Sequence, residues 1–310
     1  MSDRMNPITE QLLATVAGYA GSFEGAYNIR ENGACAGRQC SQNIQLEAKT
    51  DAPGLVIRVA PNTKGETVFI PAVVTKGAVN DLVYNDFFIG ADADVTVIAG
   101  CGVHTEDDSE ASHNGIHRFF LEKGARVFYE EKHIGTGDGA GKKRIDPVTD
   151  ATLAEDAVLE MDTLQISGVD SSVRKMTATL GARAKLIVKE RIMTDGQERA
   201  ETDFVVSMDG EDSVVDVVSR SVAKGSSYQA FRSDIRGNCR CTGHSECDAI
   251  LMDQGTVYAA PALLASDVDA SLIHEAAIGK IAGEQITKLC TLGLTEEEAE
   301  RRIIDGFLRG

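Results

Sequence analysis

The chain has 310 residues and a formal net charge of −17, from 48 acidic against 31 basic side chains. That length suits one large domain or two modest ones, and an apolar content of 43% argues against wholesale disorder. The acidic balance, with no visible basic patch, excludes a nucleic-acid partner. Since no run of 18 apolar residues and no signal-peptide stretch is present, we expect a cytoplasmic protein with no membrane partner.

Residues 1–50 are predicted to form a short N-terminal helix followed by an irregular segment. Asn6 is a good N-cap, and Pro7 suits the first helical position, where a missing N–H costs nothing. Leu12, Leu13 and Val16 then supply the apolar stripe of the helix. Residues 18–50 are polar and glycine-rich, and we expect irregular structure or the first edge of a sheet there.

Residues 51–265 are predicted to form a β-solenoid core built from repeats. Short β-rich runs alternate with glycine, aspartate and asparagine turns. The first apolar residues after successive turns are Val95, Val127, Val158, Leu186 and Val214, spaced by 32, 31, 28 and 28 residues. A period of roughly 20–50 residues is typical of stacked repeat architectures. A β-sandwich is the competing interpretation.

Residues 266–310 are predicted to form a helical module, too short to fold alone. Ala270–Leu292 has apolar residues at helical spacing, and Gly293 is a typical helix stop. Thr295 and Glu298 have the spacing of a capping box, which would begin a last helix that buries Ile304. The module would either cap the end of the solenoid or dock a partner.

The densest group of metal-ligating residue types lies in residues 239–249, CRCTGHSECDA. Cys241, His244 and Cys247 follow one another at steps of three and are candidates to surround one ion. Cys239 is close, but a second C-x2-C half is missing, so a structural zinc site would be incomplete. Buried inert thiols are the alternative. The chain has seven cysteines, and free thiols are expected in a cytoplasmic protein.

A second candidate thiol is Cys101, which has a glycine on each side, an arrangement that would leave its thiol accessible. His104, His113 and His117 follow it, with four acidic residues between the first two histidines. A loop of this composition suits a metal, although an acidic surface loop is the commoner explanation.

A third candidate is the pair His274 and Glu275, which offers one nitrogen and one oxygen ligand for iron. An inert surface pair is the alternative. Enzyme motifs are not found: GTGDGAGKKR at residues 135–144 lacks the hydroxyl residue of a P-loop, and neither G-x-S-x-G nor H-E-x-x-H occurs.

Four stretches together resemble the SufB/SufD family of iron–sulfur cluster assembly proteins. They are HEAAIGKIAGEQITKLCTLGLTEEEAERRIIDGFL at 274–308, SRSVAKGSSYQAF at 219–231, ECDAILMD at 246–253 and AGCG at 99–102. The resemblance spans about residues 80–310 and is specific only in combination. It implies a right-handed parallel β-helix flanked by helices, in agreement with the repeat period.

The resemblance implies a non-catalytic scaffold. Family members pair through their β-helices and bind an ABC-type ATPase, SufC, through the C-terminal helical region. The segment before the repeats is shorter than in SufB, which favours a homodimer carrying two ATPase subunits over a SufB–SufD heterodimer. Sulfur would come from a cysteine desulfurase or another donor, and the cluster would pass to apo iron–sulfur proteins.

Individual roles also follow from the resemblance. Cys101 matches the family's sulfur-accepting cysteine, and Cys247 matches a cysteine at the dimer interface. His274 and Glu275 match a cluster-ligand pair, although Ile273 stands where the family often has an acidic residue. The implied cofactor is a transiently bound [4Fe–4S] or [2Fe–2S] cluster, since mixed thiolate, imidazole and carboxylate ligation suits release. Further local candidates as ligands are Cys239, Cys241 and His244.

Two other functions compete with a scaffold. A SufD-like subunit would support the ATPase without holding a cluster. β-Helix folds also serve polysaccharide lyases and hydrolases, which need paired carboxylates and aromatic sugar platforms. The sequence has no tryptophan and only six tyrosines, which counts against the enzyme.

Overall fold

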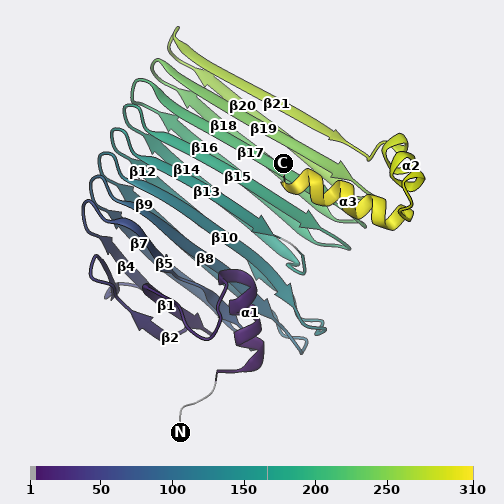
Figure 1. The fold of residues 1–310 in the computed structure, drawn as a ribbon, viewed down its shortest axis with the longest axis horizontal. Coiled ribbons are helices and arrows are strands. Elements are labelled where there is room, and N and C mark those ends of the chain that lie inside the picture. The colour runs from purple at the N-terminus through teal and green to yellow at the C-terminus, as the bar shows by residue number, and fades with distance from the viewer. Residues whose placement is uncertain (1–4, 166, 310) are drawn as a thin grey trace.

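The computed structural model describes residues 5–165 and 167–309, and its strands form a β-solenoid of about eight turns (Figure 1). The predicted parallel β-helix is confirmed, and the β-sandwich alternative is wrong. The helices are α1 (Pro7–Ala17), α2 (Gly283–Thr291) and α3 (Glu296–Arg309). In the described part of the chain, none of these helices has the length and hydropathy that crossing a bilayer requires. The predicted cytoplasmic location stays a prediction.

Each turn of the solenoid contributes strands to two facing sheets. The first sheet has the order β2 (Ala34–Gln39), β1 (Ala26–Glu31), β5 (Lys64–Phe69), β8 (Asp94–His104), β10 (Arg126–Thr136), β13 (Val158–Gln165), β15 (Lys185–Thr194), β17 (Ser213–Ala223), β19 (Cys241–Leu251) and β21 (Ala270–Gly279), with β6 (Ala72–Val74) beside β1 and β8. The second sheet has the order β20 (Thr256–Ala265), β18 (Tyr228–Gly237), β16 (Arg199–Met208), β14 (Ser171–Leu180), β11 (Lys143–Ile145), β9 (Ala111–Leu121), β7 (Asn80–Ile89), β4 (Gly54–Val59) and β3 (Ile44–Ala48), with β12 (Val148–Leu153) beside β9 and β14.

The repeat predicted from the sequence is confirmed in period and nearly in register. Val95, Val127 and Leu186 lie in one ladder of inward-facing residues on β8, β10 and β15. The predicted frame is one residue early at Val158 and Val214, since the residue after each of them occupies the inward position. The shift arises because inward and outward positions alternate on a strand, so an apolar residue on the outer face is easily taken for the first inward one.

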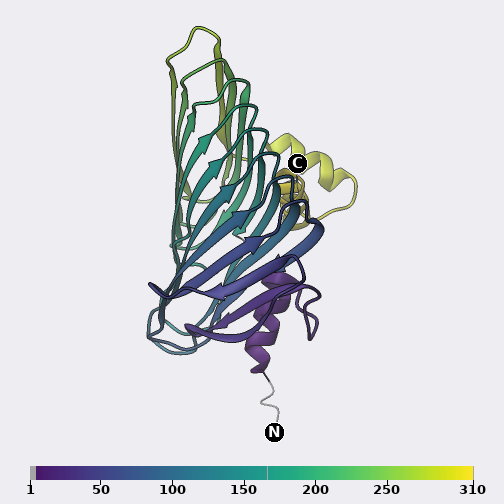
Figure 2. The same ribbon diagram turned by 90° about the vertical axis from the view of Figure 1, so that its left-hand side faces the viewer.

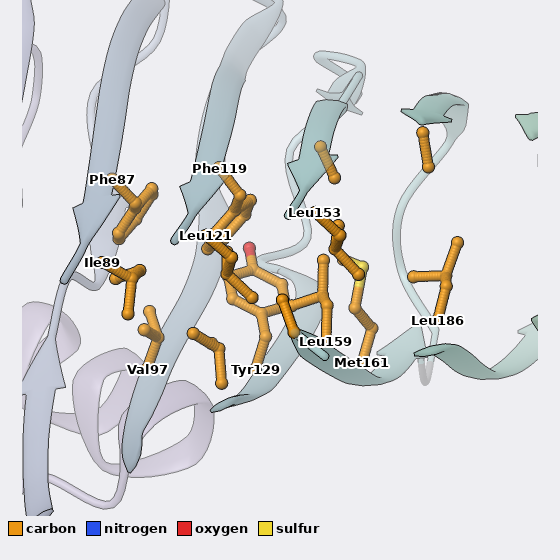
Figure 3. Packing of buried hydrophobic residues seen from close by; sticks show 14 of the residues in the cluster. Phe87, Ile89, Val97, Phe119, Leu121, Tyr129, Leu153, Leu159, Met161 and Leu186 are labelled. Carbon is orange, nitrogen blue, oxygen red and sulfur yellow. The ribbon is translucent and has the colours of Figure 1, made fainter. Parts of the chain in front are cut away.

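Stacked apolar side chains from both sheets fill the core (Figure 3). Phe87 and Phe119 lie on neighbouring turns with their rings stacked, 4.4 Å between centroids, and Tyr129 meets Phe119 edge-on at 5.4 Å. Full burial of one such side chain stabilises the fold by roughly 1.5–3 kcal/mol. Like residues therefore recur in register because each turn buries its inward row against the next.

The N-terminal segment forms the first edge of the solenoid. Asn6 caps α1 as predicted, since its Oδ1 accepts a hydrogen bond of 3.0 Å from the Ile8 amide. β1 and β2 then form an antiparallel hairpin, and β3 pairs antiparallel with β4. Asn32 and Gly33, both with positive φ, make the two-residue turn between β1 and β2. Asn-Gly is a strong hairpin signal in a sequence.

The C-terminal prediction is partly wrong. Residues Ala270–Gly279 form strand β21, which pairs in parallel with β19, and helix α2 begins only at Gly283. The apolar residues of this stretch fit a helical spacing and a strand equally, and the 29-residue step from Cys241 to Ala270 continues the solenoid instead. The solenoid therefore extends beyond the predicted boundary at residue 265, to the end of β21.

The last helix agrees with its prediction. Thr295 and Glu298 form a reciprocal capping box with hydrogen bonds of 2.9 and 3.2 Å, and α3 follows. Ile304 packs on Val222 and Ile250, at the ends of β17 and β19. α1 and α3 both cover the outer face of the first sheet, and they lie on the same side of the solenoid (Figure 2).

Candidate functional site

Cys101 lies on β8 with its thiol inside the solenoid and only 5% of the residue exposed. Gly100 and Gly102, which flank Cys101, do not expose its thiol. Gly100 and Gly102 face outward, where α1 packs, and a Cβ on Gly100 would lie 2.5 Å from the carbonyl oxygen of Val16. The expectation that the glycines expose the thiol is therefore wrong, since they make room for a helix on the opposite face of the strand.

A small cavity of about 30 Å³ borders Cys101 towards the N-terminal end of the solenoid. That volume holds about two water molecules. Asn28, Arg30 and Cys35 of the β1–β2 hairpin line it, together with His113. The cavity therefore runs from the buried thiol to the end of the solenoid where the hairpin lies.

The three histidines after Cys101 do not form a metal-binding loop, and the four acidic residues between His104 and His113 are exposed in a surface loop, as the alternative interpretation predicted. His113 and His117 belong to strand β9 and are buried inside the solenoid. His113 Nδ1 lies 2.9 Å from a carboxylate oxygen of Asp81, and His117 Nδ1 lies 2.8 Å from the hydroxyl of Tyr129. His104 ends β8 and contacts Thr136 and Glu106 instead.

Charged residues continue from Cys101 into the interior. Glu131 and His133 of β10 face inward, and His133 pairs in register with Cys101 on the neighbouring strand. Glu131 accepts hydrogen bonds of 2.8 Å from the Tyr129 hydroxyl and from Arg174 of β14. Ionised groups are rarely buried this deeply unless they are paired.

The same chain of contacts ends beside Cys247. Arg174 Nε lies 3.6 Å from Glu190 of β15, which accepts hydrogen bonds of 2.8 Å from Thr202 and from Ser219. Ser219 pairs in register with Cys247 on β19. The residues that connect the two thiols are called the interior polar row: His133, Glu131, Arg174, Glu190, Thr202 and Ser219.

Burial and neighbouring charges set the pKa values of the two thiols and of Glu131. Burial, and then the charge of Glu131, raises the pKa of Cys101 well above its ordinary value. Burial and the charge of Glu190 raise the pKa of Cys247 to about 12. Burial alone would raise the pKa of Glu131, but the charges of His133 and Arg174 outweigh it and hold that pKa well below its usual range. Both thiols are therefore protonated at neutral pH while Glu131 is ionised.

A second group of ligands lies on the outer surface near the last turn. His244, Glu246 and Glu275 place one ligand atom each within 4.8 Å of one another. His244 Nδ1 lies 2.8 Å from Asp216, which orients the ring and leaves Nε2 3.6 Å from Glu275. A carboxylate behind a histidine is the usual outer partner of a metal-bound imidazole. Residues 244, 246 and 275 are called the outer ligand group.

The structure separates several residues that the sequence grouped. His274 and Glu275 face opposite sides of β21, because neighbours on a strand alternate. His274 lies on the inward side, diagonal to Cys247, at the uncovered end of the solenoid. Cys241 also faces inward while His244 faces outward, so Cys241, His244 and Cys247 do not converge on one ion.

Cys239 precedes β19, and its thiol lies 3.4 Å from the carbonyl oxygen of Met208. It packs with Cys241 at the apolar core, six or more residues along the chain from Cys247.

Sequence reasoning missed Glu131, His133 and Glu246. A signal for the first two existed, since they alternate on a strand whose 32-residue offset places His133 against Cys101.

The geometry defines a class of protein: a β-solenoid with thiols at two depths of its interior and a nitrogen–oxygen ligand group near its open end. The family model described as SUF system FeS cluster assembly, SufBD core domain, matches residues 79–307. The chain belongs to this SufBD family.

Archaeal relatives agree with the family model. An iron–sulfur cluster assembly SufBD family protein of Methanothermobacter thermautotrophicus (strain Delta H) is 32% identical over 268 residues, covering 84% of this chain and 64% of the relative. A protein of the same description from Archaeoglobus fulgidus is 28% identical over 262 residues, 83% of this chain and 69% of the relative. The chain thus spans less than two thirds of the length of the Methanothermobacter relative.

Proposed function

We propose that this chain is a non-catalytic scaffold on which an iron–sulfur cluster is assembled before transfer to acceptor proteins. The observation that supports the proposal is the interior polar row, a set of buried polar side chains that extends from the register partner of Cys101 to that of Cys247. It includes hydrogen bonds from Arg174 to Glu131 and from Thr202 and Ser219 to Glu190. A row of donors and acceptors inside the solenoid would stabilise a polar cargo such as sulfide or persulfide. Cys101 would accept sulfur, and Cys247 would present it at the last turns.

Cluster ligands are proposed at the uncovered end of the solenoid. Cys247 and His274 face its interior side, and Glu275 lies on the opposite face of β21 with His244. The two faces would contribute to one cluster only around the edge of β21, where a second copy is proposed to join. Thiolate ligands suit iron–sulfur clusters, and imidazole or carboxylate in place of some thiolates suits a cluster that must leave. Cys239 and Cys241 are not close to this set and are not part of the proposal.

We propose that the active form is a homodimer joined at the last turn. β20 and β21 end the two sheets, so each has an edge without a neighbouring strand in the described chain. Apolar side chains lie exposed there, with Leu264 52% and Ile273 54% exposed. Exposed apolar strand edges bind further strands readily. Light scattering should give a dimer for the wild type and a monomer for Leu264→Arg.

A SufC-like ABC ATPase is the proposed partner of the C-terminal helices. α2 buries none of its residues, and Leu292 between α2 and α3 is 72% exposed. An exposed apolar residue on an amphipathic helical pair suits a protein partner. The ATPase should co-purify with the wild type and with Leu264→Arg, and it should be lost with Leu292→Asp.

Anaerobic reconstitution with iron and sulfide tests the scaffold. The wild type should show the visible and Mössbauer spectra of a cluster, and Cys247→Ala and Glu275→Ala should lose most of it while keeping their fold. Cys241→Ala is the matched control, because it removes an equally buried thiol from the same strand. A colourless wild type that still binds the ATPase would favour the SufD-like structural role.

A further inference from the structure

We infer that Cys101, Glu131 and His133 form a mononuclear binding site for a borderline divalent transition-metal ion, of the Zn²⁺ and Fe²⁺ class, inside the solenoid. One ligand atom of each residue lies within 4.8 Å of the others, and all three residues are buried. Cys101 and His133 are opposite each other on β8 and β10, and Glu131 is the next inward residue on β10. Two adjacent rigid strands therefore hold a sulfur, a nitrogen and an oxygen ligand together.

His133 gives the second, independent observation. The residue is 1% exposed, and neither ring nitrogen has a hydrogen-bond partner among the described residues. A buried polar atom left without a partner costs about 1–3 kcal/mol. A metal ion would satisfy one nitrogen, and none of the described neighbouring side chains does so.

The spacing of the ligand atoms suits one ion. Nε2 of His133 lies 3.3 Å from Oε1 of Glu131, too poorly aligned for a hydrogen bond. Zinc binds nitrogen and carboxylate oxygen at about 2.0–2.1 Å, and two such bonds at the tetrahedral angle place the ligand atoms about 3.3 Å apart. The two side chains are thus already at the separation of two ligands of one tetrahedral ion.

Glu131 is held by hydrogen bonds of the kind that orient a carboxylate ligand of a metal ion. Its Oε1 accepts a hydrogen bond from the Tyr129 hydroxyl and its Oε2 accepts one from Arg174, both of 2.8 Å. Carboxylates that bind metals are commonly held by such hydrogen bonds. They fix the orientation of Glu131 towards His133 and Cys101.

The charges of the interior also favour a cation. Arg174 is shared between two carboxylates, Glu131 at 2.8 Å and Glu190 at 3.6 Å. A thiolate at Cys101 would add another negative charge in a site from which water is largely excluded. Buried charges are stable only when compensated, and a divalent cation would compensate a Cys101 thiolate formed beside Glu131.

Of the three proposed ligands, Cys101 alone borders a cavity, and a water molecule there would be the source of a fourth ligand. The cavity of about 30 Å³ that borders Cys101 holds about two water molecules. Three protein ligands with one open position are the pattern of reactive zinc sites, while structural sites use four. A sulfur–nitrogen–oxygen set selects Zn²⁺, Fe²⁺ or Co²⁺ over Mg²⁺ and Ca²⁺.

The inference goes beyond the proposed function and does not require it. A thiolate bound to a metal ion is a weaker nucleophile than a free thiolate, so a bound ion would protect Cys101 until sulfur arrives. Binding of a single ion is measurable in a protein that assembles no cluster.

Titration of the metal-free protein with Co²⁺ tests the site, because a thiolate ligand gives a near-ultraviolet charge-transfer band and a tetrahedral ion gives intense visible bands. Wild type should show both. Cys101→Ala should lose the charge-transfer band, and His133→Leu should bind at least about tenfold more weakly. The control His244→Ala/Glu275→Ala removes two of the three residues of the outer ligand group and should keep the charge-transfer band.

The variants also separate loss of binding from loss of fold. His133→Leu breaks no hydrogen bond present among the described residues, so circular dichroism should show an intact solenoid. Zn²⁺ should slow alkylation of Cys101 in the wild type and not in His133→Leu, measured by mass spectrometry. A band retained in Cys101→Ala, a band lost in Cys247→Ala, or a wild type without a band at millimolar Co²⁺ would overturn the inference.

Discussion

Arg174 and Glu131 form an ion pair across the interior of the solenoid. Arg174 stands on β14 of the second sheet and donates a hydrogen bond of 2.8 Å to Oε2 of Glu131 on β10 of the first sheet. Their side chains are 9% and 3% exposed. The two sheets are thus joined by a buried charge pair, which lies within the interior polar row between Cys101 and Cys247.

Arg174→Leu should destabilise the protein strongly, because it leaves the Glu131 carboxylate buried without its cation. Removing one partner of a buried pair costs about 3–5 kcal/mol. The free energy of unfolding in urea measures the loss. Arg183→Leu is the matched control, since Arg183 pairs with Asp156 on the surface with half of its side chain exposed, and surface pairs contribute little. Equal losses in the two variants would contradict the importance of the buried pair.

Two histidines should shift stability with pH in opposite directions. Burial lowers the pKa of His117 to about 4, while an unfolded histidine titrates near about 6.5. The unfolded state then binds more protons between these values, so stability is full above about pH 6.5 and falls by up to about 3 kcal/mol towards pH 4. The hydrogen bond to Asp216 raises the pKa of His244, whose contribution is full below the unfolded pKa and is lost as pH rises through the raised value.

Urea unfolding from pH 4 to pH 8 checks the two signs. His117→Gln should flatten the loss of stability between pH 6.5 and 4, because the neutral amide keeps partners towards Tyr129 and Asn85 without titrating. His244→Gln should retain that acid loss. An unchanged acid limb in His117→Gln would show that the ring is not the group being charged.

Gly100→Ala should loosen α1 from the solenoid. The added methyl group would lie 2.5 Å from the Val16 carbonyl oxygen and 2.6 Å from its Cβ, too close for either to remain in place. Hydrogen exchange should therefore accelerate in residues 7–17 while the core strands stay protected. Gly279→Ala is the control, since its Cβ would meet nothing within 4 Å. Unchanged protection of α1 in Gly100→Ala would mean that the helix does not depend on this close approach.

The sequence predicted the solenoid because stacking repeats the same physical demand on every turn. Val95, Val127 and Leu186 recur at the period of one turn since each fills the same inward position. The period does not reveal which of two adjacent residues faces inward. Only the register between neighbouring turns shows which residue faces inward. For this reason the predicted inward positions at Val158 and Val214 are one residue too early.

The same ambiguity hid part of the candidate site. Glu130 and Glu131 are adjacent identical residues, and only the register with β8 shows that Glu131 is the buried one. Cys101 and Cys247 could be chosen as candidate site residues because a cysteine is a potential ligand or nucleophile whichever way its strand faces. The sequence singled out His274 and Glu275 but did not show that their side chains face opposite sides. The segment was predicted to be a helix, which would have kept the two side chains nearer to one face than the strand β21 does.

Ile304→Ala should release the C-terminal helices and weaken the proposed ATPase contact. Ile304 is 8% exposed and packs on Val222 and Ile250, so its truncation removes buried apolar contacts at the joint between α3 and the solenoid. Isoleucine-to-alanine changes in packed sites cost about 2–5 kcal/mol. Hydrogen exchange should rise by at least about tenfold in residues 296–309. Leu292→Ala, which alters an exposed residue, should leave that exchange unchanged while reducing ATPase binding. If residues 296–309 of Ile304→Ala keep wild-type hydrogen exchange but the variant no longer binds the ATPase, Ile304 itself is part of the docking surface. If both variants still bind the ATPase, the C-terminal helices are not its binding site.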